Sequence, residues 1–471
     1  MSNNQIKIFV LVPDGVSLRN FAYSSFYNQA KERGFDIVFW HHTPFNIETL
    51  GFHSISLENP KLHWLTTLLK NVRKRIEISL FANRENDNIY YKYLFPLSYS
   101  SIKKSIISIL TQFLVFCFNS EKGINIIRNL INTLEKQTAY FKHCNSVLES
   151  HKPDLVFCTS QRNALGIAPL LAAKKLNIST MSFIFSWDNL PKATLDVSAD
   201  FYVVWSQLMK NELLHYYRFV SDSQVRVTGT PQFESHYDKS LILSKDEFYS
   251  KYNLEQDITY LCFSGDDITT SPKDELYLRD IAEAVRQLNI QGHKLGLLFR
   301  RCPVDFSNRY DSVINTYHDV IIPVQPEWKK IGGSWDTILP LPDDLALLAN
   351  LAEHTEAVIN LGSSMVFDFV AHQKPCMYMN YNYLNASNSL DKEVYVYDYI
   401  HFRSKPNEEV VVWLNHPHAI SKVILDTLKC NQKTIKEASK WFEKINQHPP
   451  QFASTRILDS IVDIISTAKA K

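Results

Sequence analysis

Glycine is scarce in this chain, with 12 glycines among 471 residues. The chain lacks the glycine-rich fingerprints G-x-G-x-x-G and G-x-x-x-x-G-K-[ST], and it lacks the nucleophile elbow G-x-S-x-G. The zinc motif H-E-x-x-H is absent as well. These absences argue against a P-loop nucleotidase, a dinucleotide oxidoreductase of the usual type, an α/β-hydrolase and a zinc protease.

Cysteine is also sparse, and its seven copies are scattered without any C-x-x-C pair. An odd, unpaired set argues against a disulfide framework and against a cysteine-type zinc site. We therefore predict a reducing compartment and a metal-independent protein. The apolar run at residues 6–12 has the length of one strand and no basic leader, so we expect no secretory signal. No apolar run reaches the ~18 to 20 residues of a membrane span.

Charge of either sign is not in excess, because 50 basic residues face 49 acidic ones for a net charge of +1. This balance gives no reason to expect a nucleic-acid partner. The apolar content of 45% and the charged content of 21% are typical of a soluble globular protein. A length of 471 residues is too great for one core and predicts two domains.

The first part of the chain shows the rhythm of a parallel α/β domain. Residues 6–12 predict a buried strand, residues 18–32 a helix and residues 36–40 a second strand. The loop after the first strand of such a sheet faces the ligand crevice, which makes Asp14 and Gly15 candidate site residues. Helix capping is an equally common role for such an aspartate. The rhythm returns with strands predicted at residues 155–158, 180–185, 201–205 and 225–227.

The intervening segment, about residues 45–150, predicts a mainly helical insertion. Its most apolar part is IISILTQFLVFCF at residues 106–118, which follows Lys103 and Lys104. This part is too short to span a bilayer. We favour a buried helix, with a helix lying at a membrane surface as the alternative.

The second half repeats the scheme, and the stretch at residues 343–375 carries its strongest signal. A helix capped by Asp343 or Asp344 leads to a strand at residues 357–361, which Gly362 ends. A helix opening at Ser363 and Ser364 would offer free N–H groups and its dipole to a phosphate. Asp368, one turn further on, could accept hydrogen bonds from ribose hydroxyls. An ordinary helix cap with a solvated aspartate is the alternative.

Polar residues also follow other predicted strands. Ser264 and Gly265 end the strand at residues 259–263, and Arg300 and Arg301 end the strand at residues 295–299. Two arginines at a strand end suit a pyrophosphate because their donors bind oxygen pairs. In the first half, Trp187, Asp188 and Asn189 follow a strand, where the indole could stack on a sugar.

We predict an α/β fold of two Rossmann-like domains that face a cleft, with the helical insertion in the first domain. The predicted domains are residues 1–238 and 239–450, joined by a linker near residues 236–245. A C-terminal helix at residues 451–471 completes the chain.

Several motifs together resemble the GT-B glycosyltransferases of bacterial surface-polysaccharide assembly, in capsule or lipopolysaccharide synthesis. The wider clan holds glycerophosphotransferases, Kdo transferases and UDP-GlcNAc 2-epimerases. The motifs are YVVWS at residues 202–206, GTPQFE at residues 229–234, Arg300-x-x-Pro303, N-L-G-S-S-x-x-x-D at residues 360–368, and Lys374-Pro375.

The resemblance implies that Ser363, Ser364 and the Arg300 region hold the donor phosphates and that Asp368 meets the ribose, where relatives usually carry glutamate. It also implies that the C-terminal helix crosses back onto the first domain. Two features depart from the pattern. Cys302 stands where many relatives have histidine before proline, and the glycine-rich turn after the first strand is reduced to Gly15.

From these signals we predict an inverting, metal-independent glycosyltransferase that moves a sugar from a nucleotide-sugar donor to a glycan or lipid-linked acceptor. The nucleotide-sugar is a co-substrate, and no cofactor is expected. Asp14 or Asp188 is the catalytic base. Donor binding falls to Ser264, Gly265, Arg300, Arg301, Gly362, Ser363, Ser364 and Asp368, and the further substrate-binding residues are Gly15, Trp187, Asn189 and Gln232.

Other functions stay open on the same fold. They are a nucleotide-sugar 2-epimerase, a polyol-phosphate transferase, a glycan-assembly scaffold without catalysis and a two-domain binding protein. We expect a cytoplasmic protein, and peripheral contact with the inner membrane follows if the apolar insertion lies at the surface.

Overall fold

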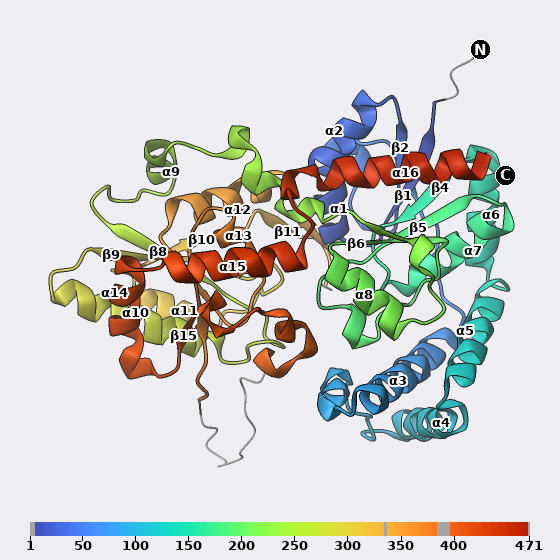
Figure 1. Cartoon of the computed structure of the whole chain (residues 1–471), viewed down its shortest axis with the longest axis horizontal. Coiled ribbons are helices and arrows are strands. Elements are labelled where there is room, and N and C mark those ends of the chain that lie inside the picture. Colours follow the sequence, from blue (N-terminus) through green and yellow to red (C-terminus); the bar gives the residue numbers. More distant parts are fainter. Residues whose placement is uncertain (1–4, 334–336, 384–395, 470–471) are drawn as a thin grey trace. The chain divides into compact units, whose positions relative to one another are not determined.

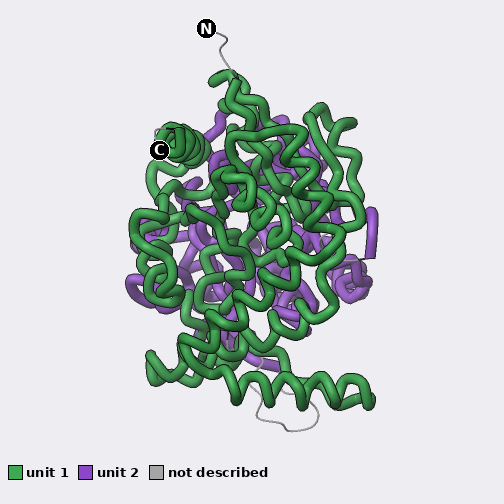
Figure 2. The backbone as a smooth tube through the Cα atoms, turned by 90° about the vertical axis from the view of Figure 1, so that its right-hand side faces the viewer, with its two compact units in different colours: residues 1–231, 399–401, 445–471 green, residues 232–398, 402–444 purple. Residues whose placement is uncertain are grey.

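The computed structural model describes residues 5–333, 337–383 and 396–469. Its contacts divide the chain into two compact units, coloured separately in Figure 2. Unit 1 comprises Met1–Pro231, Tyr399–His401 and Ile445–Lys471, and unit 2 comprises Gln232–Asp398 and Phe402–Lys444.

Unit 1 is built on a seven-stranded sheet in the order β3-β2-β1-β4-β5-β6-β7, in which every neighbouring pair is parallel. Its central strands are buried on both faces, which explains their continuous apolar sequences. The strands are β1 (Lys7–Val12), β2 (Asp36–His41), β3 (Ser54–Ser56), β4 (Leu155–Cys158), β5 (Ser179–Phe183), β6 (Phe201–Val204) and β7 (Val225–Val227).

Helices surround this sheet (Figure 1). The last of them, α16, packs on α2, and Arg33 pairs there with Asp459 at 2.6 Å. The helices of unit 1 are α1 (Gly15–Ala22), α2 (Ser25–Glu32), α3 (Thr66–Glu85), α4 (Ile102–Phe118), α5 (Glu121–Glu135), α6 (Ala139–His151), α7 (Ile167–Lys175), α8 (Gln207–Tyr216) and α16 (Ala453–Lys469).

Unit 2 is built on a six-stranded parallel sheet in the order β10-β9-β8-β13-β14-β15. The strands are β8 (Thr259–Ser264), β9 (Leu295–Arg300), β10 (Ile321–Val324), β13 (Val358–Asn360), β14 (Cys376–Met379) and β15 (Val412–Leu414), and β11 (Trp328–Lys330) and β12 (Ile338–Pro340) form a separate antiparallel ribbon. The helices are α9 (Lys245–Lys251), α10 (Asp274–Ile290), α11 (Asp311–Thr316), α12 (Asp343–His354), α13 (Met365–Val370), α14 (Ile420–Lys429) and α15 (Gln432–Ile445).

Two parallel α/β sheets confirm the predicted fold class. Three local predictions differ from the structure. The single helix expected at residues 18–32 is two helices, because the Ser24 hydroxyl donates to the Asn20 carbonyl at 2.6 Å and accepts from the Phe26 N–H, which caps a new helix. The segment at residues 236–245, predicted as a linker, contains short helical turns and the buried His236, and the boundary between the two units falls before it, between Pro231 and Gln232.

The third difference concerns the apolar run at residues 106–118. The favoured prediction of a buried helix is wrong, because most of α4 is exposed and only Ser108 and Thr111 on it are buried. Over the described ranges, no helix combines the length and the apolar character that crossing a bilayer requires.

Candidate functional site

The predicted residues of unit 1 lie at the carboxyl edge of its sheet. Asp14 follows β1 and Asp188 follows β5, while Gln161, which was not predicted, follows β4. Because these three strands are neighbours, their loops gather at one edge.

Asp14 is a helix cap in this structure. Its side chain accepts a hydrogen bond from the Ser17 N–H at 2.8 Å, and Gly15 is the first residue of α1. Asp14 is only 1% exposed. Asparagine caps helices as well as aspartate does, so capping alone does not require the charge.

Asp188 is the centre of a polar network. One carboxylate oxygen accepts from the Asn189 amide at 2.8 Å, and the other accepts from the Lys192 ammonium. The Asn189 side chain also accepts from the amide of buried Gln161 at 2.9 Å, and Gln161 in turn accepts from the Phe185 N–H at 2.7 Å. Gln161, which the sequence reasoning missed, thus holds the loop that carries Asp188.

His401 completes this network, and sequence reasoning missed it because it lies far along the chain. Its ring meets the Trp187 ring edge-on, with centroids 4.8 Å apart. Burial lowers the pKa of His401 to about 4, although the Asp188 charge opposes this, so its ring is neutral at pH 7. Burial alone would raise the pKa of Asp188, but Lys192 and His401 outweigh it and hold that pKa well below its ordinary value. Asp188 is therefore ionised at neutral pH, and its side chain is 21% exposed.

The predicted residues of unit 2 lie at the carboxyl edge of the other sheet, after the neighbouring strands β9, β8 and β13. Ser264 ends β8 and lies opposite Arg300, which ends β9. One guanidinium nitrogen of Arg300 donates to both oxygens of buried Asp344, at 3.1 and 3.2 Å. Its Nε–H is buried and has no acceptor among the residues that the structure describes.

Arg301 is more open. It donates to the Ser307 carbonyl at 2.6 Å, approaches Asp311 at 3.5 Å, and lies over the Tyr310 ring. Its Nε–H also has no acceptor within the described ranges. The two arginines thus each keep one buried donor at the sheet edge. The neighbouring Cys302 supplies no charge there, since burial raises its pKa to about 12.

The turn after β13 depends on Gly362. Its φ of +68° lies in the left-handed region, and an added Cβ would come within 3.1 to 3.3 Å of three side chains. The Ser363 N–H donates to Asn360 at 2.9 Å, and Ser364 precedes α13 without a side-chain cap. Since α13 has only six residues, its dipole is weaker than that of a longer helix.

Asp368 does not face open solvent. Its carboxylate lies 2.8 Å from His236 Nε2, His236 Nδ1 lies 3.0 Å from His372 Nε2, and His372 Nδ1 lies 2.7 Å from Glu353. This chain of four side chains runs from buried Asp368 to the half-exposed Glu353. Gln232, the remaining predicted residue, begins unit 2 and is half-buried.

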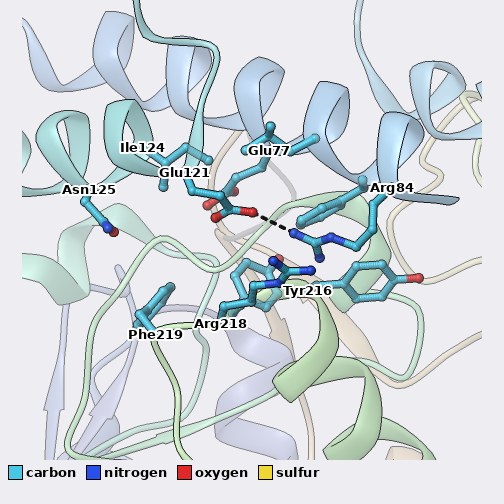
Figure 3. Close-up of a pocket in the computed structure, with 11 residues that line it drawn as sticks. Glu77, Arg84, Glu121, Ile124, Asn125, Tyr216, Arg218 and Phe219 are labelled. Atoms are coloured by element: carbon cyan, nitrogen blue, oxygen red, sulfur yellow. Dashed lines mark hydrogen bonds and ion pairs between the residues drawn. The ribbon is translucent and has the colours of Figure 1, made fainter. Parts of the chain in front are cut away.

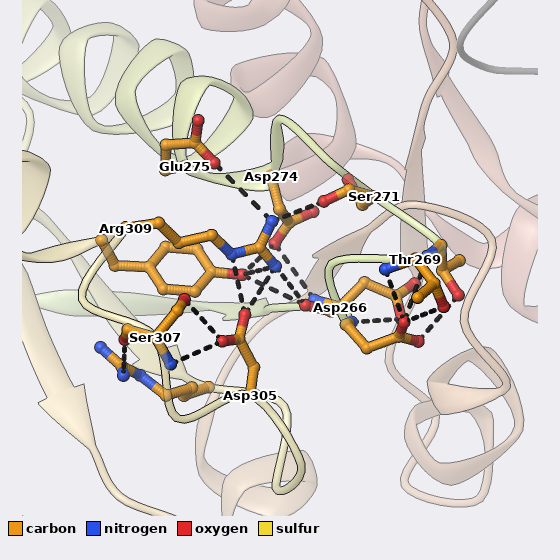
Figure 4. Close-up of polar contacts among 12 residues, drawn as sticks. Asp266, Thr269, Ser271, Asp274, Glu275, Asp305, Ser307 and Arg309 are labelled. Atoms are coloured by element: carbon orange, nitrogen blue, oxygen red, sulfur yellow. Dashed lines mark hydrogen bonds and ion pairs between the residues drawn. The ribbon is translucent and has the colours of Figure 1, made fainter. Parts of the chain in front are cut away.

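An acidic cluster occupies the loops after β8 and β9 (Figure 4). Asp274 accepts from the Tyr310 hydroxyl at 2.8 Å and from the Asp266 N–H at 3.1 Å. Arg309 donates to Asp305 at 2.8 Å and to the Asp266 carbonyl at 2.6 Å. Gly265 lies beneath this cluster, where an added Cβ would come within 3.1 Å of the Tyr310 hydroxyl.

The two carboxyl groups of this cluster titrate unusually. Burial raises the pKa of Asp274 to about 6, and burial together with Asp274 and Asp267 raises that of Asp266 well above its ordinary value. Across the described ranges, no group of three or more His, Cys, Asp or Glu side chains is placed to hold a metal ion.

A pocket of about 310 Å³ lies elsewhere in unit 1, among α3, α5 and the end of α8 (Figure 3). The Arg84–Glu121 ion pair, at 2.7 Å, forms part of its wall. Sequence reasoning did not find this pocket, because its walls come from three separate helices. It contains none of the predicted site residues.

The comparisons with known proteins give structural matches only. No protein-family model matches the chain, and no curated protein matches its sequence. A UDP-GlcNAc 2-epimerase from Neisseria meningitidis bound to UDP-GlcNAc is similar, with 11% identity, a TM-score of 0.56, and coverage of 97% of this chain and 100% of the other.

Two further solved structures are similar to this chain over nearly its whole length. MnaA from S. aureus, in a co-structure with UDP, has 13% identity and a TM-score of 0.54, and the match covers 98% of this chain and 97% of MnaA. A glycosyltransferase from Rickettsia africae has 12% identity and a TM-score of 0.52, with 98% and 99% covered. With its two parallel α/β units, the chain therefore has the GT-B fold that the sequence predicts.

Proposed function

We propose that this protein is an inverting glycosyltransferase that takes a sugar from a nucleotide-sugar donor. The observation that carries the proposal is the pair Arg300 and Arg301 at the carboxyl edge of the unit 2 sheet, each with a buried N–H lacking an acceptor among the described residues. Similar structures of the same fold, in complexes with UDP and UDP-GlcNAc, support a nucleotide diphosphate as the ligand.

In the proposed donor site, Arg300 and Arg301 bind the diphosphate, together with the backbone around Ser363 and Ser364. Gly362 gives this turn its left-handed geometry and Ser264 lines the neighbouring strand end. The Arg300–Asp344 pair fixes the guanidinium plane before a ligand arrives, which lowers the ordering cost of binding. Asp368 is proposed to accept from the ribose, with His236 holding its carboxylate in one orientation.

Asp188 is the favoured base. It is ionised at neutral pH and partly exposed, whereas Asp14 is buried and engaged as a cap. In the reaction, the acceptor hydroxyl gives its proton to the carboxylate and its oxygen bonds to the anomeric carbon. The bond from that carbon to the donor phosphate breaks, and the nucleotide diphosphate leaves. The guanidinium charges of the donor site stabilise the departing phosphate without a metal.

The proposed acceptor is a glycan or a lipid-linked saccharide of bacterial surface-polysaccharide synthesis, and the proposed location is the cytoplasm. Free cysteines support a reducing location, since all seven are unpaired. Trp187, Asn189, Gly15 and Gln232 stay proposed substrate contacts.

A 2-epimerase is the second candidate, because one of the similar structures is a UDP-GlcNAc 2-epimerase bound to UDP-GlcNAc, and its match covers 97% of this chain. Inversion at C2 breaks the C2–H bond and re-forms it with a solvent proton. Incubation of UDP-GlcNAc alone in deuterated water would therefore place deuterium at C2. Such incorporation without an acceptor would favour the epimerase over the transferase.

The donor proposal is tested by thermal unfolding with UDP, CDP, GDP, CMP and dTDP. A nucleotide at ~100 times its dissociation constant should stabilise the protein by about 2.7 kcal/mol. The stabilisation should fall in Arg301→Gln. It should persist in Arg286→Gln, which removes a half-buried arginine that pairs with Asp319 elsewhere in unit 2. If no nucleotide stabilises the protein, the non-catalytic scaffold becomes the better proposal.

A further inference from the structure

Helix α4 buries two hydroxyl side chains and turns large apolar side chains outward. Ser108 and Thr111 are buried, where their hydroxyls donate to the carbonyls of Ser98 and Ile107 at 2.8 and 2.7 Å. The helix packs against α3 and α5 and lies at the outer edge of unit 1 (Figure 1). This is the reverse of an ordinary surface helix, whose apolar stripe faces the core.

The outward residues form one continuous stripe, which we call the α4 face. They recur at alternating spacings of four and three residues, which places them on one side of the helix. Each is between 60% and 85% exposed, and the members are Ile102, Ile106, Ile109, Phe113 and Phe116. A contiguous exposed stripe of this kind marks an interaction surface.

The segment that contains α4 carries charge of one sign along the sequence. No Asp or Glu occurs from residue 88 to residue 120, whereas Lys92, Lys103 and Lys104 lie in this stretch and are exposed. Exposed Phe95 and Tyr99 precede the helix, and the Arg75 guanidinium holds that segment by donating to the Phe95 carbonyl at 2.6 Å. Aromatic and basic residues beside an apolar helix face are typical of the membrane–water interface.

We propose that the α4 face docks this protein on the surface of an anionic phospholipid bilayer, with α4 lying in the plane of the interface. The 17 residues of α4 are too few to cross the ~30 Å hydrocarbon core at 1.5 Å per residue. Lipid phosphates supply the negative charge that the lysines need. The α4 face of a second copy would not supply negative charge, because residues 88–120 contain no Asp or Glu. The inference does not depend on the proposed reaction.

Vesicle cosedimentation of the full chain tests the docking. We expect binding to vesicles of phosphatidylcholine with 30% phosphatidylglycerol at low salt, and much weaker binding to phosphatidylcholine alone. The double variant Ile106→Ser with Phe113→Ser should bind about tenfold more weakly or worse. The matched control, Ile290→Ser with Phe452→Ser, removes two exposed apolar residues elsewhere and should bind as the wild type does. Lys103→Gln with Lys104→Gln should lose roughly 30-fold on anionic vesicles.

A probe on the helix tests its orientation. Cys117 on α4 and Cys430 in unit 2 are exposed, and the remaining cysteines are buried or half-buried. An environment-sensitive fluorophore on Cys117, in a Cys430→Ser background, should shift to the blue with anionic vesicles. The same fluorophore on Cys430, in a Cys117→Ser background, should not.

Three results would overturn the inference: no vesicle binding by the wild type, equal losses in the test and control variants, or a dimer in solution that the α4 variant abolishes while vesicles are not bound. The last result would make a second copy the occupant of the face. Nucleotide-dependent stabilisation of the same samples reports separately on the proposed function.

Discussion

The carboxylate of Asp368 lies 2.8 Å from Nε2 of His236, and both side chains are buried within unit 2. Residues 132 positions apart in the sequence thereby join a hydrogen-bonded chain that continues through His372 to Glu353. Because both ring nitrogens of His236 have a hydrogen-bond partner, the ring cannot rotate without breaking a hydrogen bond. The pair therefore fixes the orientation of a carboxylate that we propose to contact a ribose.

Replacement of this carboxylate should destabilise the protein. Asp368→Ala leaves buried His236 with one unsatisfied nitrogen, which should lower the free energy of unfolding by about 1–3 kcal/mol. Urea denaturation at pH 7 measures the change. Glu353→Ala, at the half-exposed end of the same chain, is the control and should cost less than about 1 kcal/mol. Equal losses of unfolding free energy in the two variants would show that the buried position of Asp368 adds no stability beyond that of the half-exposed Glu353.

The Arg300–Asp344 pair gives a second stability prediction. Both side chains are at most 6% exposed, so Arg300→Met strands a buried carboxylate and should cost about 3–5 kcal/mol. Adding Asp344→Leu should recover part of this loss, because it removes the stranded charge. Recovery should be incomplete, since Asp344 also accepts from the Glu327 N–H.

The control for this pair is Arg286→Met, which breaks an exposed ion pair with Asp319. It should change the free energy of unfolding by no more than about 1 kcal/mol. If Arg300→Met costs no more than Arg286→Met, the Arg300–Asp344 pair does not stabilise the fold. The proposed phosphate-binding role of Arg300 would then be tested only by nucleotide binding.

The fold was predictable because it follows from local patterns. Continuous apolar runs of strand length, each followed by polar residues and a helical pattern, are sufficient to indicate parallel sheets. They also indicate the strand ends at Ser264 and Arg300 and the loops after strands that carry Asp14 and Asp188. Which partner each side chain would meet was not predictable. His236 with Asp368 and Trp187 with His401 are contacts between distant segments, and periodicity carries no information about them.

The wrong prediction for α4 has a related cause. The apolar run at residues 106–118 predicts that its side chains are shielded from water. It does not show whether the protein core or another surface covers them. The decisive signal was the position of Ser108 and Thr111, which share the buried side of the helix. Their spacing of three residues could have indicated a polar inner face.

The Asp274 carboxyl predicts a pH dependence of stability. Its folded pKa is raised to about 6 from an ordinary value near 3.8, so its contribution is fully present below pH 3.8 and is lost as the pH rises through 6. The shift corresponds to roughly 3 kcal/mol. Asp274→Asn, which keeps an acceptor for Tyr310, should therefore gain stability relative to the wild type between pH 4 and pH 7.

Asp319→Asn is the matched control, because its pairing with Arg286 lowers the pKa of Asp319. A carboxylate with a lowered pKa stabilises above its unfolded pKa and loses that contribution as the pH falls. The difference between Asp319→Asn and the wild type should therefore stay nearly constant between pH 4 and pH 7 and shrink only as the pH falls below 3.8. Parallel curves for Asp274→Asn and the wild type would show that Asp274 does not titrate in this range.

The choice between Asp188 and Asp14 gives the prediction for catalysis. If Asp188 is the base, Asp188→Asn should lower kcat by ~100-fold or more with the donor dissociation constant unchanged. Asp14→Asn should keep near-normal turnover, because asparagine preserves the cap on α1. Turnover is measured by release of the nucleotide diphosphate, and donor affinity by calorimetry. The reverse pattern would assign the base to Asp14.

The pH profile separates Asp188 from a histidine base. Lys192 and His401 outweigh the effect of burial and keep the pKa of Asp188 well below its ordinary value, and burial keeps His401 neutral down to about pH 4. The protonation states at this site therefore do not change between pH 7 and pH 5, and kcat should not fall for lack of a base over that interval. An acid limb near pH 6.5 in the wild type would indicate an ordinary histidine as the base and would exclude Asp188. Lys192→Met should move the acid limb upward, because it removes the charge that most favours the ionised carboxylate.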